Sequence, residues 1–564
     1  MTDLAQAQEL FFSALAIQKD GDFSGAEILY RKALALAPDR PSILNNLAVV
    51  LQLQGKHMES LGCSERLLDM NERDASAWMN RGNAEAGLKL LPQALASYDR
   101  ALEITPDYAD ALVNRASALA MSHRQGEALD DLQRALEIVP DHLEARINRA
   151  GVLVDLHRPE EALADYQRCL EREPENAKIL SSLGNALLEA GKVQEALIAC
   201  ERAVALDPGY ADAFQNRGNV LRDLRRYPEA LQDYARAQVL APAQPGAYWN
   251  EALCRLLVGD FEHGWTHYAK GWDAGQRGRH PSFAQPAWNG ACVDGTLLAW
   301  GEQGIGDQIL HCSMLDRLRA FAQHLVVAVD PRLIPLFKRS FADIEFISLA
   351  DLEKTAGFAA QVALGDLGAY FRRQPEHFPG NRTAYLCADF TRAGELRQRL
   401  KADGKFRCGI SWRSANSRLG KFKSLALADF ADVISIPGVQ CVDLQYGDTS
   451  EERLALKKSR GLEVIHVDDI DNFSDIDGFA ALIDACDMVV SVSNTTVHLA
   501  GALGKPTAVL LPYAQGRIWY WHEGGQTSPW YPACRLYRQP AIGEWGQVMT
   551  AVAAAVRRAS ADAC

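Results

Sequence analysis

The residues best placed to do chemistry lie in the segment "LLAWGEQGIGDQILHC" (297–312), where Gly304 and Gly306 are followed at once by Asp307. A glycine turn between an apolar run and a helical run is a common binding place for phosphorylated ligands. The P-loop pattern is excluded, because Asp307 stands where its lysine would be. The dinucleotide pattern fits only after a shift of frame, and no ribose-binding acid follows about 20 residues on. The turn therefore predicts a carboxylate at a helix N-terminus.

Asp307 has two interpretations on spacing alone. The helix dipole favours the anionic form of a carboxylate at this place, so the side chain would be ready to act as a general base. Aspartate is equally a common residue for capping a helix N-terminus. Both interpretations stay open at this point.

A second candidate site lies in "MVVSVSNTTVHLAG" (488–501). A buried strand is predicted to end at Ser493-Asn494-Thr495-Thr496, and a helix rich in small residues follows. Hydroxyls and free backbone N–H groups at a helix N-terminus would hold the phosphates of a nucleotide. His498, in the first turn, is either a contact to phosphate or substrate, or a packed structural histidine.

A basic loop, "GISWRSANSRLGKFKSL" (409–425), lies between these two segments, just past a predicted strand end. Its basic residues could neutralise a departing phosphate, although exposure to solvent is the ordinary role of each: Arg413, Arg418, Lys421 and Lys423. Several aromatic residues could stack on a base or a sugar, although each is more often found in a core: Trp412, Tyr446, Trp519, Trp521 and Trp530.

The elements that must position these residues alternate between short apolar runs and helical stretches. Strands are predicted in "TLLAW", "HLVVAVD", "IEFIS", "FRCGISW", "VQCVDLQ", "LEVIHV", "MVVSVS" and "TAVLLP". Such alternation predicts parallel sheets covered by helices on both faces. A polar stretch (391–405) separates two sets of strands, so we expect an α/β region of two doubly wound halves, 295–395 and 396–564, with ligands at the carboxyl ends of the strands. The segment 273–294, rich in glycine, proline and arginine, is predicted to be a linker.

The N-terminal half is a repeat array. Prolines recur in steps of 34 residues at Pro38, Pro106, Pro140, Pro174, Pro208 and Pro242, with Glu72 at the one gap. One unit, "ASAWMNRGNAEAGLKLLPQALASYDRALEITPDY" (75–108), has the spacings of a tetratricopeptide repeat. Small residues such as Gly82 and Ala94 let its two helices approach closely. We therefore predict an α solenoid over residues 1–272, of seven repeats (about 7–244) closed by an eighth helical pair.

An asparagine recurs with the same period, at the sixth position of the first helix of each repeat, with Ser182 at the one gap. The row comprises Asn46, Asn80, Asn114, Asn148, Asn216 and Asn250. Since an amide both donates and accepts hydrogen bonds, such a row could hold the backbone of an extended acceptor protein. The alternative is that these amides cap or bridge neighbouring helices.

The composition of the chain argues against several classes of function. A net charge of −13 and a pI near 5.5 argue against a nucleic-acid partner. The first residues show no basic region followed by an apolar one, and no apolar window is long enough for a membrane span, so we expect a cytoplasmic protein. The twelve cysteines are scattered singly, without metal-binding spacing, so we expect reduced thiols and no bound metal.

Taken together, the motifs resemble the heptosyltransferase-type glycosyltransferases (family 9, GT-B fold), in the branch in which tetratricopeptide repeats precede the transferase. The matching segments are "EQGIGDQI", "GISW…KS", "LQYGD", "SVSNTTVHLAGALGKP" and "SPWYPACRLYRQ". The asparagine row is similar to that of the repeat domain of O-linked N-acetylglucosamine transferase. The resemblance spans essentially the whole chain.

The resemblance implies an inverting, metal-independent protein O-glycosyltransferase that uses a nucleotide-sugar donor, without a further cofactor, and flagellin as an acceptor. It implies that Asp307 is the catalytic base and that Lys421 or Lys423 supports the leaving group. The donor-binding residues that it implies are Gly304, Gly306, Trp412, Arg413, Gln445, Asn494, Thr495, Thr496 and His498. One position departs from the family, which often has Asp-Thr where this chain has Asn494-Thr495. That change allows a differently charged donor, such as a CMP-linked nonulosonic acid, or a transferase that has lost activity.

Three other functions are compatible with the sequence. The pairs Asp469/Asp471 and Asp475/Asp477 form two DxD strings, which in a GT-A enzyme would hold Mg²⁺ or Mn²⁺. A repeat array with a relic transferase domain could serve as a non-catalytic adaptor or chaperone. Transfer to lipopolysaccharide is the third, although a lipid acceptor has no use for a peptide groove.

Overall fold

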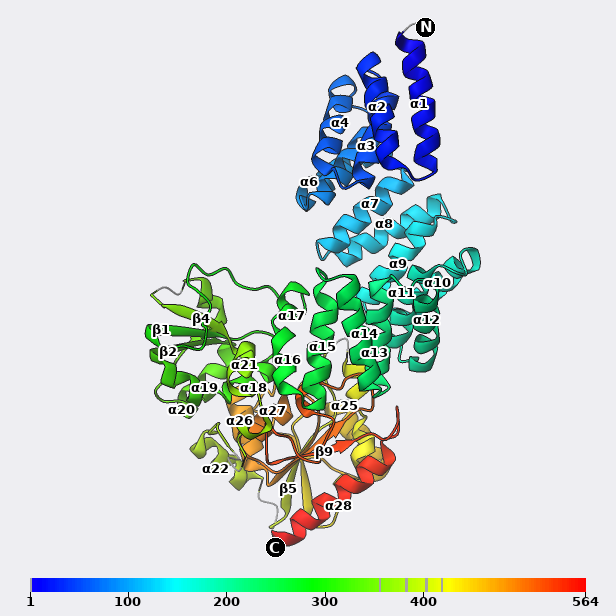
Figure 1. The fold of residues 1–564 in the computed structure, drawn as a ribbon. Helices are drawn as coiled ribbons and strands as arrows, with labels where there is room; N and C mark the ends of the chain where they lie inside the picture. The colour runs from blue at the N-terminus through cyan, green and yellow to red at the C-terminus, as the bar shows by residue number, and fades with distance from the viewer. Residues whose placement is uncertain (1–2, 355–356, 381–383, 401–403, 417–418, 564) are drawn as a thin grey trace. The chain divides into compact units, whose positions relative to one another are not determined.

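The computed structural model describes all residues except 1–2, 355–356, 381–383, 401–403, 417–418 and 564. The chain divides into two compact units, 1–208 and 209–564, which are described separately. The first unit is entirely helical in its described part: α1 (Asp3–Lys19), α2 (Phe23–Leu36), α3 (Pro41–Leu53), α4 (His57–Met70), α5 (Ala75–Gly87), α6 (Leu91–Ile104), α7 (Ala109–Met121), α8 (Gln125–Ile138), α9 (Leu143–Asp155), α10 (Pro159–Arg172), α11 (Ala177–Glu189) and α12 (Val193–Leu206). Figure 1 shows these helices as successive antiparallel pairs.

In two repeats of this unit, close helix packing depends on a glycine that faces a side chain of the paired helix, whereas Ala48, Ala116 and Ala150 occupy the same position in other repeats. A Cβ built at Gly82 would lie 2.6 Å from the Tyr98 ring, and one built at Gly184 would overlap Cys200 Sγ. At Gly82 and Gly184 only glycine fits, and the buried alanines at the other positions are the next smallest residue, so the period of small residues in the sequence has a direct steric cause.

A second recurring contact is an ion pair that the sequence analysis did not predict. Arg115 on α7 forms a bidentate ion pair with Asp131 on α8, at 2.8 and 2.7 Å. Arg149 and Asp165, 34 residues further on, repeat it at 2.8 and 2.7 Å. The pair joins the two helices of one repeat, and its signal in the sequence is an arginine and an aspartate that both recur with the repeat period.

The second unit begins with five more helices of the array: α13 (Ala211–Asp223), α14 (Tyr227–Leu240), α15 (Pro245–Val258), α16 (Phe261–Tyr268) and α17 (Lys270–Asp273). The segment that follows is packed, since Arg277 and Trp288 are only 2% and 4% exposed. It leads directly into the first strand.

Two parallel sheets follow. The first has the order β3-β2-β1-β4, from β1 (Val293–Trp300), β2 (Ala322–Val329), β3 (Glu345–Ser348) and β4 (Ala360–Ala363). The second has the order β6-β5-β7-β8-β9, from β5 (Phe406–Ser411), β6 (Val439–Asp443), β7 (Met488–Val492), β8 (Thr507–Leu511) and β9 (Cys534–Arg538). The described helices of this region are α18 (Ile305–Cys312), α19 (Leu315–Leu318), α20 (Ile334–Ser340), α21 (Gly368–Phe371), α22 (Phe390–Arg399), α23 (Gly420–Lys423), α24 (Ala431–Ile434), α25 (Ser450–Arg460), α26 (Ile476–Ala485), α27 (Thr495–Ala502) and α28 (Gly546–Asp562).

The prediction of a helical array followed by parallel sheets is therefore confirmed, with one strand wrong and two missed. "LEVIHV" is no strand: it forms a single bridge between Ile465 and Val442, after which an acidic turn takes the chain away from the sheet. The missed strands are β4 and β9, whose short runs "AQVA" and "CRLYR" interrupt apolar residues with polar ones.

The two sheets are brought together by α18 and α27, each of which follows a strand and begins at that strand's carboxyl end. The contact is close, because a Cβ built at Gly306 would lie 2.8 Å from the His498 ring. Gly306 is thus needed for packing between the two helices.

Candidate active site

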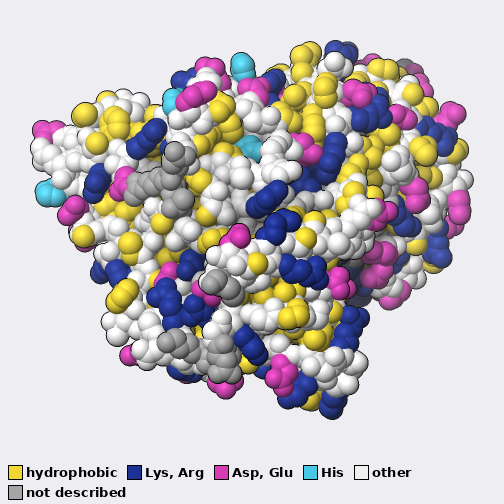
Figure 2. Space-filling view, turned by 90° about the horizontal axis from the view of Figure 1, so that it is seen from below, with side chains coloured by type: hydrophobic (Ala, Val, Ile, Leu, Met, Phe, Trp, Pro, Cys, Tyr) yellow, Lys and Arg dark blue, Asp and Glu magenta, His cyan; other side chains and the backbone are white. Residues whose placement is uncertain are grey.

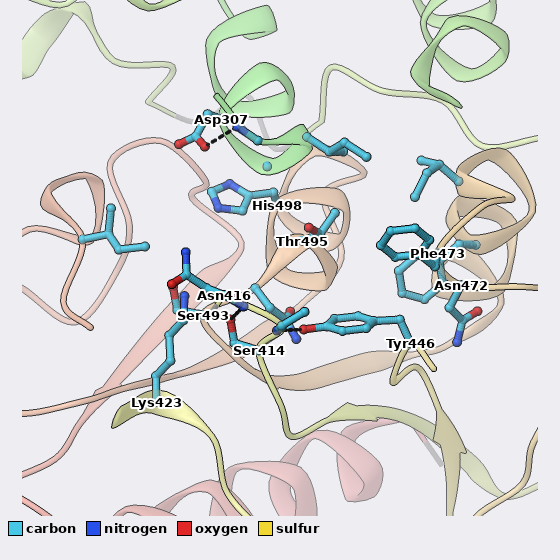
Figure 3. Close-up of a pocket in the computed structure, with 18 of the residues that line it drawn as sticks. Asp307, Ser414, Asn416, Lys423, Tyr446, Asn472, Phe473, Ser493, Thr495 and His498 are labelled. Carbon is cyan, nitrogen blue, oxygen red and sulfur yellow. Dashed lines mark hydrogen bonds between the residues drawn. The ribbon is translucent and has the colours of Figure 1, made fainter. Parts of the chain in front are cut away.

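A pocket of about 320 Å³ lies where these helix N-termini meet, lined by residues from both sheets' connecting loops. It brings together seven of the residues predicted from the sequence: Gly304, Gly306, Asp307, Lys423, Asn494, Thr495 and His498. Figure 3 shows Asp307, His498 and Lys423 toward one end and Tyr446, Asn472 and Phe473 toward the other.

Asp307 contributes to the cap of its own helix. The N-cap residue of α18 is Gly304 and not Asp307, which is the third residue of the helix, but the backbone N–H of Gly304 donates to Asp307 Oδ2 at 3.2 Å, as in one half of a capping box. Burial nevertheless raises the pKa of the Asp307 carboxyl to about 6, against the opposing effects of the Gly304 N–H and the Lys423 ammonium. The helix N-terminus alone predicts a pKa shift in the other direction. A carboxylate with a pKa just below neutrality is well suited to general-base catalysis.

Lys423 is the basic residue that reaches the pocket. Its side chain is buried, with only 4% of the residue exposed, and burial lowers the pKa of its ammonium to about 8, while Asp307 opposes the shift. Lys421, two residues earlier on α23, is exposed and lies over the Phe422 ring instead. The structure therefore separates the two lysines, and Lys421 does not line the pocket. Arg418 lies outside the described residues.

Asn494 caps the N-terminus of α27 and holds two strand ends together. Its amide Nδ2 donates to Ser411 Oγ at 2.8 Å and to the carbonyl of Arg413 at 3.0 Å. Its Oδ1 accepts from the N–H of Thr496 at 3.0 Å and from Ser491 Oγ at 3.1 Å. Because an aspartate could not donate to the Arg413 carbonyl, the asparagine has a structural reason of its own at this position.

The two threonines after Asn494 differ. Thr495 lines the pocket, and no described residue accepts its backbone N–H, so this first N–H of α27 remains available to an anion. Thr496 is fully buried beneath the turn and does not line the pocket, which contradicts its predicted contact with the donor.

His498 is held by two tyrosines. Its Nδ1 is 2.9 Å from the Tyr531 hydroxyl and its Nε2 is 3.2 Å from the Tyr520 hydroxyl. Burial lowers the pKa of His498 to about 3, so the ring is neutral at physiological pH. Since both nitrogens are occupied by protein partners, the packed-histidine interpretation is favoured, and the ring forms part of the pocket wall.

Three other predicted donor contacts lie outside the pocket. Trp412 is fully buried and donates from Nε1 to Glu452 at 3.1 Å. Arg413 forms an ion pair with the same carboxylate at 3.1 Å. Gln445 is buried, and its Oε1 accepts from the N–H groups of Trp412 and Arg413 at 2.9 and 2.8 Å. These residues shape the loop after β5 rather than contact a ligand, because tertiary packing uses their polar atoms.

Sequence analysis did not predict most of the residues at the opposite end of the pocket. Asn472 and Phe473 line this end. They lie in the segment after Ile465, that is, after the predicted strand "LEVIHV" that the structure does not form. Tyr446, which was considered among the aromatic candidates, lines it as well. Its hydroxyl donates to the Arg413 carbonyl at 3.2 Å and accepts the N–H of Ala415, so the ring is fixed in place.

A buried ion cluster holds the loop that contains Gly304 and Gly306, through Glu302 at the start of that loop. Arg277, from the connecting segment, pairs with Glu302 and with Asp366, and its guanidinium lies 4.2 Å from the Trp272 ring centroid. Burial raises the pKa of Glu302 to about 7, although Arg277 opposes the rise. The glycine loop is thus anchored at Glu302, five residues before Asp307.

The DxD aspartates are used in ion pairs and turns. Asp469 pairs with Arg399 at 2.8 Å, Asp475 with Arg392 at 2.6 Å, and Asp477 with Arg339. Asp471 accepts from the N–H of Phe473 at 2.9 Å. Across the described residues, no three His, Cys, Asp or Glu side chains are grouped as a metal site would require. Such pairing of opposite charges is common on the surface, and on the face seen in Figure 2 basic and acidic side chains are interspersed.

The asparagine row lies where the repeat period predicted, at the sixth residue of α3, α5, α7, α9, α13 and α15. Two of its members bridge helices: Asn80 donates to Asn45 Oδ1 at 2.8 Å, and Asn148 donates to Ser117 Oγ at 3.3 Å. Asn46 donates to the Ser42 carbonyl at 2.8 Å. The first two bonds favour the structural alternative at Asn80 and Asn148, the Asn46 bond lies within its own helix, and the role of Asn114, Asn216 and Asn250 stays a prediction.

Comparison with known proteins identifies the array. Family models described as "Tetratricopeptide repeat" match residues 54–109, 91–142 and 147–211, and a second such model matches 29–62 and 199–232. The helical array consists of tetratricopeptide repeats. The chain is also similar to "Protein FlbA" of Caulobacter vibrioides, with 32% identity over 329 residues, 54% of this chain and 54% of FlbA. The chain thus spans about half the length of the curated relative that it matches.

Several solved repeat proteins are similar to this chain. One from Parabacteroides merdae covers 44% of this chain and 99% of its own, at 19% identity and a TM-score of 0.37. YrrB, titled a TPR protein with an unusual peptide-binding site, covers 33% and 95%, at 28% identity and a TM-score of 0.27. A thermophilic repeat protein of Thermus thermophilus covers 32% and 99%, at 25% identity and a TM-score of 0.30. Within the described residues, no helix has the length and apolar character needed to cross a membrane.

Proposed function

We propose that this protein is an inverting, metal-independent O-glycosyltransferase that moves a sugar from a nucleotide-sugar to a Ser or Thr of a protein. The observation that carries the proposal is the pairing of Asp307 and Lys423 in one pocket, a carboxyl with a pKa of about 6 and an ammonium with a pKa of about 8. An acid and a base whose pKa values are shifted toward neutrality by burial are typical of catalytic sites.

In the proposed reaction, Asp307 takes the proton of the acceptor hydroxyl as its oxygen attacks the anomeric carbon of the donor. A new C–O bond forms, and the bond from the anomeric carbon to the phosphate oxygen breaks with its electron pair going to the nucleotide. Attack from the face opposite the leaving group inverts the anomeric centre. The proton remains on Asp307, whose raised pKa makes it a better acceptor than an exposed aspartate.

The leaving phosphate would be stabilised by Lys423 and by the N-terminus of α27. Lys423 is nearly buried in the pocket wall, and burial lowers the pKa of its ammonium, so an anion beside it would compensate a desolvated charge. The free N–H of Thr495 and the helix dipole add favourable electrostatics. These groups supply the charge stabilisation that a metal ion supplies in other transferases.

The proposed role of the repeats is to bind the acceptor protein. Tetratricopeptide arrays suit the binding of a protein partner, and tethering the acceptor raises its effective concentration at the site. Flagellin, modified in the cytoplasm, is the acceptor that we propose from the family resemblance. We assign 295–395 to the base loop and acceptor, and 396–564 to the nucleotide-sugar, which includes a CMP-linked nonulosonic acid among the candidates.

The test is to incubate the full chain with a flagellin and UDP-, GDP-, ADP- or CMP-linked sugars and to measure the intact mass of the flagellin. We expect a sugar-sized mass increase with the wild type and none with Asp307→Asn. Asp343→Asn, which changes an aspartate whose side chain is 84% exposed, is the matched control and should transfer normally. Nucleotide binding without any transfer would support the adaptor instead.

A further inference from the structure

The loop that follows β8, residues 512–523, supports the pocket at the N-terminus of α27. Tyr520 lines the pocket, and its hydroxyl is 3.2 Å from His498 Nε2. Trp521, the next residue, donates from Nε1 to Ser493 Oγ at 2.7 Å. Both partners also line the pocket, so the position of this loop determines where one wall of the site lies.

The same loop packs against Lys423. Gly516 has a left-handed backbone, and a Cβ built there would lie 3.5 Å from the Leu419 carbonyl oxygen and 3.6 Å from Lys423 Cβ. The backbone of the loop is therefore in van der Waals contact with α23. Because this contact covers the Lys423 side chain, the loop contributes to the burial that lowers the pKa of the ammonium.

The loop is held in turn by two repeat helices of the same unit, α13 and α14. Arg517 follows Gly516 directly, and its side chain is only 7% exposed. Its Nη1 donates to the Tyr227 hydroxyl at 2.7 Å and to the Glu523 carboxylate at 2.6 Å. Its Nη2 donates to the carbonyl of Arg222 at 3.2 Å. One guanidinium thus joins both ends of the α13–α14 turn to the loop.

Arg225, within that turn, holds the loop at a second point. Its guanidinium lies 4.3 Å from the Tyr513 ring centroid and pairs with Glu523 at 3.2 Å. Glycine adopts the left-handed backbone of this position most easily, so the turn itself does not require an arginine. The same conformation recurs every 34 residues at the turn of each helix pair: Gly21, Gly55, Lys89, His123, His157, Gly191, Arg225 and Gly259.

We propose that Arg517 is a positioning residue for the transfer, which fixes the 512–523 loop, and with it Lys423 and Tyr520, to the last of the seven repeats. The α13–α14 pair is then part of the catalytic unit, in addition to any part that it has in binding the acceptor. This inference rests on the proposed function, because it assigns to that repeat a part in the same reaction. Displacement of catalytic groups by about 1 Å slows a reaction by up to about a hundredfold, so the hold on this loop should be visible in the rate.

The first experiment measures transfer by the full chain at saturating flagellin and nucleotide-sugar. Arg517→Met should lower kcat about tenfold and leave the KM for flagellin unchanged, because the bonds that it removes lie at the pocket wall. Arg225→Gly removes the second hold without straining the turn, and it should lower kcat by a smaller factor. His157→Gly is its matched control, since the same exchange is made at an exposed residue in the turn of another repeat, and kcat should not change.

The second experiment does not depend on activity. It measures the pH dependence with which acetic anhydride acetylates Lys423, by mass spectrometry of the peptide that contains it. The wild-type midpoint should be about 8. In Arg517→Met and Arg225→Gly the midpoint should rise by about half a pH unit or more as water reaches the ammonium, and in His157→Gly it should not.

An unchanged midpoint in both Arg517→Met and Arg225→Gly would overturn the inference, and so would a wild-type kcat in both, while the proposed function would stand. If the wild type transfers no sugar to flagellin, the proposed function and the part of the repeat in it are wrong. The midpoint then still decides whether the repeat fixes the surroundings of Lys423.

Discussion

The Asp307 carboxylate should lower the stability of the second unit at neutral pH, so replacing it should stabilise the fold while it removes activity. Burial raises the pKa of this carboxyl from 3.8 to about 6. The native state therefore binds the proton more tightly than the unfolded state, and the free energy of unfolding falls as pH rises from about 4 through 6. A shift of about 2 units corresponds to up to about 3 kcal/mol above pH 6.

Asp307→Asn is the informative substitution because it keeps the helix cap. The Oδ1 of an asparagine can still accept the N–H of Gly304, which donates to Asp307 at 3.2 Å. The variant should thus gain up to about 3 kcal/mol at pH 8, with the gain shrinking toward zero as pH falls through 6 to about 4. Transfer activity should fall about a hundredfold or more, as loss of a general base requires.

Urea unfolding followed by tryptophan fluorescence measures this gain in the right part of the molecule. Every tryptophan except Trp78 lies after residue 208, so the signal reports mainly on the second unit. Asp343→Asn serves as the control at pH 8 and pH 4.5. Equal or lower stability of Asp307→Asn at pH 8 would refute the claim that the carboxylate is desolvated, and retained transfer would refute its role as base.

Four further predictions follow from the geometry of the pocket and of the ion cluster. The pH profile of kcat/KM should rise through about 6, as Asp307 loses its proton, and fall through about 8, as Lys423 loses its own. Lys423→Met should abolish transfer whereas Lys421→Met should not, as rate measurements with a common donor will show. Asn494→Asp should cost about 2–4 kcal/mol in urea unfolding, because a carboxylate oxygen would face the Arg413 carbonyl. Arg277→Met should cost about 3–5 kcal/mol, most of it recovered when Glu302→Gln is added, since the single variant leaves a buried carboxylate without its cation.

The repeat array could be predicted from the sequence because its determinants are local. The contact between Gly82 and Tyr98 spans only 16 residues, and the same spacing joins Gly184 to Cys200. Each repeat fixes its own packing, so a pattern read at one period suffices. The Arg115–Asp131 pair has the same spacing and was equally available to sequence analysis.

The charged end of the pocket was predictable for a topological reason. Asp307, Lys423 and Thr495 each follow a strand of a parallel sheet, and the carboxyl ends of parallel strands lie along one edge. The sequence could not decide between Lys421 and Lys423, because two residues on one short helical turn point to different sides, and which side is buried depends on tertiary packing.

The aromatic end and the ion cluster below the glycine loop could not be predicted. Asn472 follows an isolated bridge rather than a strand, so no sheet rule places it beside Tyr446. Arg277 lies in a segment of linker composition, and its burial against Glu302 depends on residues 25 positions apart. This chain has Asn494 where the family that it resembles often has Asp. Sequence analysis explained the difference by a differently charged donor or by lost activity, whereas in the structure the Asn494 amide donates to Ser411 and to the Arg413 carbonyl.

The shifted pKa values of Asp307 and Lys423 have a consequence for the order of events in the proposed reaction. Each group favours the charged form of the other, but burial outweighs that attraction at both. A phosphate bound beside Lys423 would stabilise the ammonium and so raise its pKa, and the same negative charge would raise the pKa of Asp307 further. Donor binding would therefore make the carboxylate a stronger base at the moment when the acceptor hydroxyl needs one. Since departure of the nucleotide removes that charge, the same electrostatics would help Asp307 to release its proton before the next cycle.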